Sequence, residues 1–271
     1  MKIVTLTLLL LLSNLCAAQG WLPAGARSMS MANASVGMYD VWSYHNNPGS
    51  LGKIDRLSAG ISYENRFLLR ELQSQGMAVA VPLKVGVISL GGFTYGYTQY
   101  RSTKAGLGYS MPLSEKLYAG VQLNYQGIQF AQNYGSANAL TGEAGVYGEI
   151  NEHCSFGMSV FNLGRTKLAE FEDDRFSTLM HFGTAYTFSD KVIVSAEFEK
   201  AVEYELRFKS GVEYEVMKNF YVRGGVATAP IEFTFGTGYD FGFLQLDLGS
   251  AYHQVLGWSP HFSLIYQGKA K

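Results

Sequence analysis

The stretch LQLDLG, residues 244–249, alternates between leucine and a polar or small residue. This period of two places the leucines on one face of a β-strand and Gln245, Asp247 and Gly249 on the other. The same alternation recurs in four further segments, at residues 192–199, 206–215, 231–239 and 258–266. The chain is therefore predicted to form a sheet whose two faces differ in chemistry.

The composition indicates the surroundings of that sheet. Charged residues make up 16% of the chain, well below the ~25% of an ordinary soluble domain, whereas aromatic residues reach 14%. A net charge of −1 gives no electrostatic basis for binding nucleic acid, so no such partner is expected. Few charges and many aromatic residues together favour a surface that does not face only water.

Two all-β folds fit the alternation, a soluble sandwich and a transmembrane β-barrel. Three features favour the barrel. The apolar faces often begin or end with Trp, Tyr or Phe, as in the aromatic girdles of membrane barrels. The opposite faces carry Gly, Ser, Gln and charged residues along whole segments. The segments also reach ~10 residues, the length that a tilted strand needs to cross a bilayer. A soluble exported β protein remains the weaker alternative.

Fourteen strands are predicted, an even number that leaves both chain ends on the periplasmic side. They lie near residues 56–67, 72–82, 85–96, 101–111, 115–130, 137–150, 153–163, 175–188, 191–202, 205–216, 219–228, 231–240, 243–253 and 258–267. Short links rich in turn residues fall on one side, and longer links, including 131–137 and 164–175, fall on the other. This asymmetry is typical of outer-membrane barrels.

The N-terminus has the layout of a secretory signal peptide over residues 1–18, with Lys2 before an apolar run and small residues at Ala17 and Ala18. A lipoprotein signal at Cys16 is the less favoured alternative. Cleavage after Ala18 leaves Cys154 as the remaining cysteine, so no internal disulfide is expected.

Residues 19–55 precede the first strand and show no sustained alternation. This segment is too apolar for a free tail, and a fourteen-stranded barrel is wide enough to need filling. We therefore expect a hatch in the lumen, with a segment packed beneath the barrel as the alternative. The expected hatch residues are Trp42, Tyr44, His45, Asn46, Asn47, Pro48 and Gly49, aromatic wedges followed by a turn. The barrel is expected to span residues 56–267, followed by a short tail at 268–271.

Charged side chains are predicted to face the lumen on the ninth to eleventh strands: Glu197, Glu199, Arg207, Lys209, Glu213, Glu215 and Arg223. They fit a ladder of cross-strand ion pairs, or a polar conduit or docking surface for the hatch. An acidic run in the loop at 164–175, from Glu170 to Asp174, fits a solvated loop or a bridge to lipopolysaccharide through divalent cations.

Catalytic and metal-binding patterns are absent from the sequence. The five histidines show no paired ligand spacing, so no metal and no cofactor are expected. His261 and Ser263 share an inward face, and we interpret them as polar lumen residues because no third orienting group is evident. The chain is therefore predicted not to be an enzyme.

The run GARSMSMANASVGMYDVWSYHNNPGSLG, residues 25–52, resembles the N-terminal signature of the FadL-like outer-membrane proteins. It is most similar to the PorV/PorQ branch of Bacteroidota, in which a Gly-Ala-Arg start leads to an Asn-Pro-Ala-Gly-Leu turn. Here the turn reads Asn47-Pro48-Gly49-Ser50-Leu51. The resemblance implies a fourteen-stranded outer-membrane barrel with an N-terminal hatch, in contact with membrane lipid and lipopolysaccharide.

The resemblance implies two functions. The first is a scaffold or accessory role in protein secretion of the type IX kind, with secretion-machinery proteins as partners. The alternative is a FadL-like gated channel for a small hydrophobic ligand. The compact outer loops favour the first, because they lack the long excursions that build a ligand-capturing groove. The chain also departs from common barrel proteins at its end, where Tyr266 is followed by QGKAK.

Overall fold

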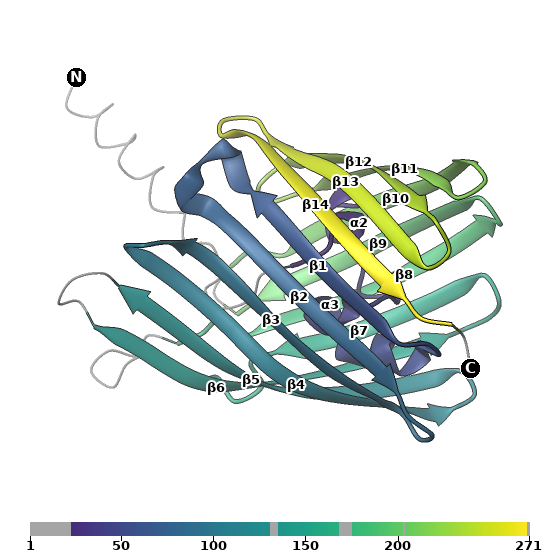
Figure 1. Ribbon diagram of the computed structural model, residues 1–271, viewed down its shortest axis with the longest axis horizontal. Helices are drawn as coiled ribbons and strands as arrows, with labels where there is room; N and C mark the ends of the chain where they lie inside the picture. Colours follow the sequence, from purple (N-terminus) through teal and green to yellow (C-terminus); the bar gives the residue numbers. More distant parts are fainter. Residues whose placement is uncertain (1–22, 131–134, 168–174, 203, 270–271) are drawn as a thin grey trace.

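The computed structural model describes residues 23–130, 135–167, 175–202 and 204–269. Within these residues, fourteen antiparallel strands close into one barrel, in which sequence neighbours pair and β1 pairs with β14 (Figure 1). The strands are β1 Ser58–Asn65, β2 Gln73–Pro82, β3 Val87–Tyr97, β4 Tyr100–Ser114, β5 Leu117–Phe130, β6 Ser136–Glu149, β7 Cys154–Phe161, β8 Leu179–Ser189, β9 Val192–Ala201, β10 Arg207–Met217, β11 Phe220–Ala227, β12 Glu232–Asp240, β13 Leu244–His253 and β14 Gly257–Gln267. The predicted barrel and its strand count are confirmed, and the soluble sandwich is excluded.

The start of β8 differs most from the prediction, which placed it at residue 175 rather than Leu179. Side-chain hydrogen bonds turn the chain before it joins the ladder. Asn162 Nδ2 donates to the Phe176 carbonyl, and the Thr178 hydroxyl donates to the Asn162 carbonyl. Asn162 also has a positive φ of 55°, a turn conformation that asparagine tolerates. Such local capping leaves no signal in the alternation of a sequence.

The two rims of the barrel differ in their links. The rim beside the C-terminus, here the periplasmic rim, carries the short links 83–86, 115–116, 150–153, 190–191, 218–219 and 241–243. The opposite, extracellular rim carries the link 162–178 and also 66–72, where the short helices η2 Arg66–Leu68 and η3 Arg70–Leu72 lie. This is the asymmetry of outer-membrane barrels.

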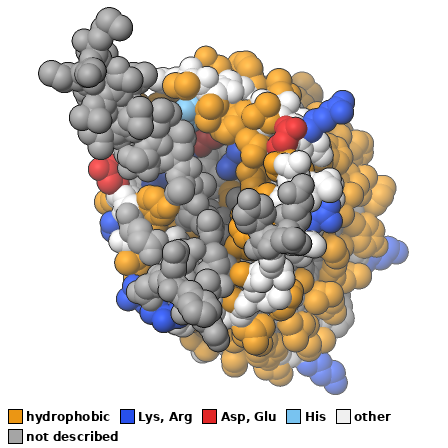
Figure 2. All heavy atoms as spheres, turned by 90° about the vertical axis from the view of Figure 1, so that its left-hand side faces the viewer, with side chains coloured by type: hydrophobic (Ala, Val, Ile, Leu, Met, Phe, Trp, Pro, Cys, Tyr) orange, Lys and Arg blue, Asp and Glu red, His pale blue; other side chains and the backbone are white. Residues whose placement is uncertain are grey.

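The outside of the barrel is apolar. The outward positions of the strands expose large hydrophobic side chains, among them Ile61, Leu90, Leu107, Val121 and Phe182. Figure 2, which views the extracellular rim, shows such side chains covering much of the outer surface. A closed barrel has no free strand edge, so its backbone groups are all paired, as a bilayer requires. Its apolar exterior matches the hydrocarbon of the bilayer. The chain is therefore an outer-membrane barrel.

The segment from residue 23 to 57, here called the hatch, lies inside the barrel (Figure 1). It contains three short helices, α2 Ala26–Ser30, α3 Ser43–Asn46 and η1 Pro48–Lys53, and most of its side chains are buried. Among the described residues, no helix is long and apolar enough to cross a membrane. The predicted signal peptide and the first residues of the predicted hatch, 19–22, lie outside the described residues.

Candidate functional site

The hatch lies directly on inward-facing glycines of the barrel wall. A Cβ added at Gly157 would overlap the Val36 carbonyl, and one added at Gly211 would lie 2.5 Å from Met31 Cβ. Eleven wall glycines approach the hatch in this way, on eleven different strands: Gly60, Gly76, Gly91, Gly120, Gly145, Gly157, Gly183, Gly211, Gly225, Gly236 and Gly249. We call them the glycine track. Because no side chain fits there, the track fixes how closely the hatch approaches the wall.

The first half of the hatch follows the wall from β14 down to β7. Its backbone is held by wall side chains at four points: Ala26 N to Ser263 Oγ on β14 (3.0 Å), Ala32 N to Thr234 Oγ1 on β12 (3.0 Å), Ser35 N and Val36 N to Glu197 Oε2 on β9 (2.9 Å each), and Gly37 O from Ser155 Oγ on β7 (2.7 Å). Ala26 is the first residue of α2, and Ser35, Val36 and Gly37 lie between the helices, so the wall satisfies backbone groups that no helix pairs. Ala32 N also donates to the Met29 carbonyl at 3.2 Å.

The Asn-Pro turn attaches the second half of the hatch. Asn47 Oδ1 accepts from Gly49 N (3.0 Å), and its Nδ2 donates to the carbonyls of Val36 (2.8 Å) and Val146 (3.0 Å). The Ser110 hydroxyl donates to the Pro48 carbonyl at 2.6 Å. One asparagine thus satisfies the backbone of the turn, of the first half of the hatch and of β6 together.

One side of the hatch rests on an apolar part of the wall, here called the apolar seat. The wall contributes Ala78, Ala80, Val87, Phe93 and Ile265, and the hatch contributes Ala24, Val41, Trp42, Tyr44, Leu51 and Ile54. Trp42 and Tyr44, both predicted as wedges, are fully buried here. Few hydrogen bonds accompany the burial. Tyr44 OH donates to the Gly91 carbonyl (3.1 Å), and His45 Nε2 lies 3.2 Å from the Met77 carbonyl.

His45 belongs to this side as well, with its ring against Tyr44 and Phe93 at centroid distances of 4.9 and 6.0 Å. Burial lowers the pKa of His45 to about 3, and the nearby charge of Lys104 acts in the same direction. The ring is therefore neutral at physiological pH, which suits its apolar surroundings.

The other side of the hatch is held by salt bridges between charged side chains, and we call this part the charged seat. It is a chain of alternating charges, Asp40 and Arg27 of the hatch, then Glu213 of β10, Arg223 of β11 and Asp247 of β13. Arg27 grips Glu213 with Nε (2.9 Å) and Nη2 (2.8 Å), and its Nη1 lies 3.5 Å from Asp40. Arg223 reaches Glu213 at 2.5 Å and Asp247 at 2.7 Å.

Burial has opposite consequences for the two hatch ions. It raises the pKa of Asp40, although Arg27 and the amide of Trp42 (2.7 Å from Asp40 Oδ1) oppose that rise. Burial would lower the pKa of Arg27, but the bidentate contact with Glu213 outweighs it and the pKa is raised. Arg27 therefore stays charged, and the fork geometry of its contact fixes the position of α2.

A second ion cluster lies beside the charged seat and also holds the hatch. Lys209 Nζ contacts Glu197 (3.1 Å) and Glu199 (2.5 Å), and His181 Nδ1 lies 2.9 Å from Glu197. His181, Glu197 and Glu199 lie close enough together to be considered as metal ligands. The ammonium group of Lys209 already contacts both carboxylates, however, so an ion-pair cluster accounts for their grouping.

The predicted inward charges thus separate into two roles. Glu213 and Glu197 bind the hatch itself, while Arg223, Lys209 and Glu199 support them. At the ends of the same strands, Arg207 pairs with Glu232 at 2.8 Å and Glu215 accepts from Asn219 N at 2.8 Å. Two of the three interpretations that the sequence left open, an ion-pair ladder and a docking surface for the hatch, therefore describe contacts in the same region.

Several hatch contacts were missed from the sequence, above all Arg27, Asp40 and Asp247 of the charged seat. Arg27 lies in the N-terminal run at residues 25–52, but the sequence alone suggested no role for it. A signal was available, because a cation within an otherwise apolar lumen segment needs a buried carboxylate partner. The partner itself could not be identified, since Glu213 is 186 residues away in the chain.

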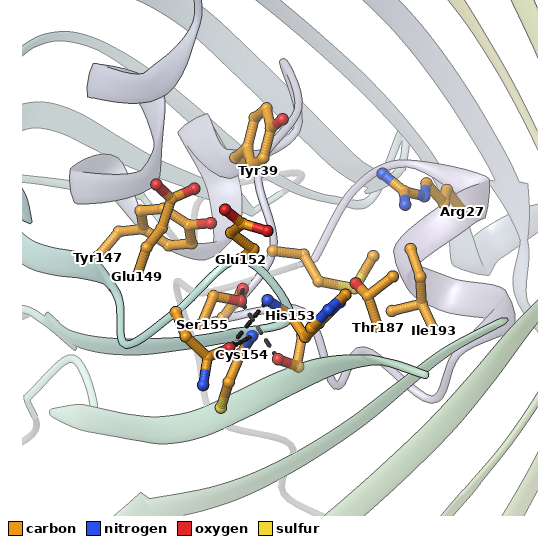
Figure 3. Close-up of a pocket in the computed structure, with 14 residues that line it drawn as sticks. Arg27, Tyr39, Tyr147, Glu149, Glu152, His153, Cys154, Ser155, Thr187 and Ile193 are labelled. Atoms are coloured by element: carbon orange, nitrogen blue, oxygen red, sulfur yellow. Dashed lines mark hydrogen bonds between the residues drawn. The ribbon is translucent and has the colours of Figure 1, made fainter. Parts of the chain in front are cut away.

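A cavity of about 360 Å³ lies below the hatch at the periplasmic rim, and we call it the vestibule. Arg27, Met38 and Tyr39 of the hatch line one side of it. Wall residues of β6 to β9 and of the link 150–153 line the other, including Tyr147, Glu149, Glu152, His153, Ser155, Thr187 and Ile193. Figure 3 shows Tyr39 and Arg27 across the cavity from Cys154 and Ser155. Arg27 therefore belongs to the charged seat and also lines the vestibule at the periplasmic rim.

His261 and Ser263 both lie on the inward face of β14, where both side chains are buried. The Ser263 hydroxyl is fully buried and accepts the amide of Ala26, so it anchors the start of α2. The acidic run from Glu170 to Asp174 lies outside the described residues.

No family model and no curated protein matches the sequence. Solved structures with the same fold include the CymD monoaromatic hydrocarbon channel, at 12% identity and a TM-score of 0.70 over 92% of this chain and 98% of that one. The Ralstonia pickettii toluene transporter TbuX is similar at 12% identity and 0.64, over 94% and 99%. A Pseudomonas aeruginosa FadL homologue is similar at 12% identity and 0.65, over 93% and 99%.

At such low identity the likeness shows the fold alone. The barrel is similar to those of FadL-like channels, as the N-terminal run implied. Membership of the PorV/PorQ branch and an association with type IX secretion gain no support from these structures, and both stay predictions.

Proposed function

We propose that the chain forms a gated channel for small hydrophobic molecules, which the hatch closes in this structure. The observation that carries the proposal is the two-sided attachment of the hatch. The charged seat holds one edge through directional ion pairs, whereas the apolar seat holds the other mainly through burial. If the hatch separates from the wall on the apolar side, the exposed surfaces form a path. A hydrophobic molecule can enter this path favourably, whereas water and polar solutes cannot.

The vestibule supplies the lower end of such a path. It opens at the periplasmic rim and reaches the hatch at Met38 and Arg27. A molecule passing the hatch would therefore enter an existing cavity. The comparisons support the same class of cargo, since the similar structures include a monoaromatic hydrocarbon channel and a toluene transporter.

A reversible lock across the apolar side tests the proposal. A Cβ added at Gly76 of β2 would lie 3.0 Å from Ala24 Cβ, close to the ~3.5–4.5 Å of a disulfide. An added Cβ at Gly76 would also lie 2.7 Å from Ser62 Oγ, so Ser62→Ala is needed to make room for it. The double variant Ala24→Cys with Gly76→Cys, in a Ser62→Ala and Cys154→Ser background, can thus tie the hatch to the wall. Uptake of a fluorescent aromatic hydrocarbon into proteoliposomes is expected to fall on oxidation and to return on reduction. Each single cysteine variant serves as a control.

A second variant tests the opposite direction. Gly157→Val places a side chain where the Val36 carbonyl lies, so the hatch cannot seat and hydrocarbon flux should rise. Gly142→Val is the matched control, because a Cβ there meets no atom within 4 Å. If hydrocarbon flux changes neither on formation of the disulfide nor in Gly157→Val, the channel proposal is refuted. Heat-modifiable migration on a gel confirms in each case that the barrel is folded.

A further inference from the structure

The outer surface of β2, β3 and β4 changes abruptly from polar to apolar. Cross-strand pairing places Gln75, Thr94 and Thr103 side by side on one outward row near the extracellular rim. Arg101, also outward and exposed, lies beyond that row. Two outward rows closer to the periplasm, the strands carry Val79, Leu90 and Leu107 side by side. Leu90 and Leu107 are among the most exposed hydrophobic side chains of the barrel.

The opposite wall lacks this change. There the outward row of Phe182, Phe198 and Phe208 joins β8, β9 and β10. It lies about as close to the extracellular ends of its strands as the polar row does on β2 to β4. Two outward rows at similar depth therefore have opposite chemistry, so a uniform belt of lipid tails does not account for the polar one.

A cavity of about 280 Å³ lies at the polar row, lined by Gln73, Gln75, Thr94, Tyr95, Gly96 and Arg101. It offers two amides, a hydroxyl and a guanidinium group. Guanidinium forks bind phosphate bidentately, and amides and hydroxyls suit the hydroxyl groups of sugars. The apolar rows directly below offer a surface for acyl chains.

We propose that this outward cavity binds the phosphorylated sugar headgroup of an outer-leaflet glycolipid, with the acyl chains lying over Leu90 and Leu107. Arg101 holds the phosphate, Gln75 and Thr94 contact the sugar, and the apolar rows hold the chains. Charge complementarity and the continuity of the cavity with the lipid-facing surface identify the occupant as a lipid rather than free phosphate. This inference is independent of the proposed channel, because the cavity faces away from the lumen.

Native mass spectrometry of the full chain, released from nanodiscs that contain bis-phosphorylated lipid A, tests the site. Wild-type barrel is expected to retain the glycolipid, and Arg101→Gln to retain about tenfold less, the effect of losing charge-assisted hydrogen bonds to phosphate. Lys84→Gln is the matched control, since it removes one exposed cation from the periplasmic rim. Thr94→Leu, which makes the polar row apolar on an exposed position, should also reduce retention.

Two probes separate the headgroup from other anions. Dephosphorylated lipid A should be retained no better by the wild type than by Arg101→Gln. Inorganic pyrophosphate should fail to displace bound lipid A, because it lacks chains for the apolar rows. Equal retention by Arg101→Gln and Lys84→Gln, full retention of the dephosphorylated lipid, or complete displacement by pyrophosphate would each overturn the assignment.

Discussion

The two seats of the hatch hold the same short segment by different physical means. In the apolar seat, Trp42 and Val41 of the hatch bury themselves against small and aliphatic wall residues. In the charged seat, Arg27 is clamped by Glu213, which is itself clamped by Arg223. Burial of apolar surface contributes roughly 25 cal/mol per Å² and tolerates small displacements. A buried ion chain adds little net stability, but it strongly disfavours a misplaced hatch.

Under the proposed gating, the two seats would have separate roles in placing the hatch and in releasing it. Position comes from the charged seat, because a bidentate contact permits one geometry. Adhesion comes chiefly from the apolar seat, whose contacts a hydrophobic molecule would replace in the proposed channel. Loss of each seat should therefore have a recognisable signature in the local opening of the hatch, which amide hydrogen exchange reports as a free energy.

The largest effect is expected for Glu213→Ala. Removal of this carboxylate leaves Arg27 and Arg223 buried without their shared partner, at a cost of about 3–5 kcal/mol. Hydrogen exchange of the α2 and 31–40 amides in detergent micelles should accelerate accordingly. Glu215→Ala is the matched control, since that carboxylate caps the turn at Asn219. Equal acceleration in both variants would mean that the charged seat does not position the hatch.

A smaller loss is expected for Val41→Ala in the apolar seat. Removing part of a fully buried side chain should cost roughly 1–3 kcal/mol, through lost burial and the cavity left behind. The control is Val255→Ala at a position that is 84% exposed, where the change should be within about 0.5 kcal/mol. If Val41→Ala and Glu213→Ala are combined, their effects should add when the two seats act independently. Strong coupling would show that the two seats are one unit.

Acidification should loosen the apolar side in particular. The pKa of His45 is about 3 in the seated hatch and ~6.5 when the hatch is free, so the contribution of neutral His45 is complete above pH 6.5. It is lost as the pH falls from 6.5 towards 3, since only the free hatch then takes up the proton. At pH 5 the loss is about 2 kcal/mol. In His45→Phe, amide exchange of the hatch should no longer accelerate through His45 as the pH falls from 6.5 to 5. If the variant and the wild type have the same pH profile, His45 is not the group responsible.

The smallest effect is expected at the end of the hatch, where Lys53 Nζ pairs with Glu149 at 2.8 Å in the periplasmic mouth. Both side chains are about a quarter exposed, so water and salt screen the pair. Lys53→Met should cost no more than about 1 kcal/mol, measured by exchange of the amides at 48–57. A loss as large as that of Glu213→Ala would show that the rim, and not the lumen, fixes the hatch.

Much of the barrel could be predicted because strands have a strict period. The alternation of 244–249 assigns Leu248 to the lipid and Asp247 to the lumen, where the structure has them at 49% and 0% exposure. The lumen charges of β9 to β11 followed from the same rule. The beginning of β8 did not, since it depends on side-chain bonds of Asn162 that no periodicity records.

The seats of the hatch were only partly predictable. Trp42 and Tyr44 stood out as bulk beside a turn, and their chemistry requires burial. The partners of Arg27 and Asn47 lie far along the chain, and cross-lumen contacts depend on barrel width and strand register together. The glycine track was visible only as a glycine-rich inner face, because the sequence does not show which hatch atom meets which glycine.

The glycine track has a consequence for biogenesis. All fourteen strands touch a segment that directly precedes β1, eleven of them through the track, and the ring closes where β1 meets β14. Because the hatch is continuous with β1 and fills the ring, we expect closure of the ring and packing of the hatch to be coupled during assembly. Substitutions in the track, Gly157→Val among them, should accordingly lower the yield of inserted barrel as well as raise the flux through the barrels that do insert.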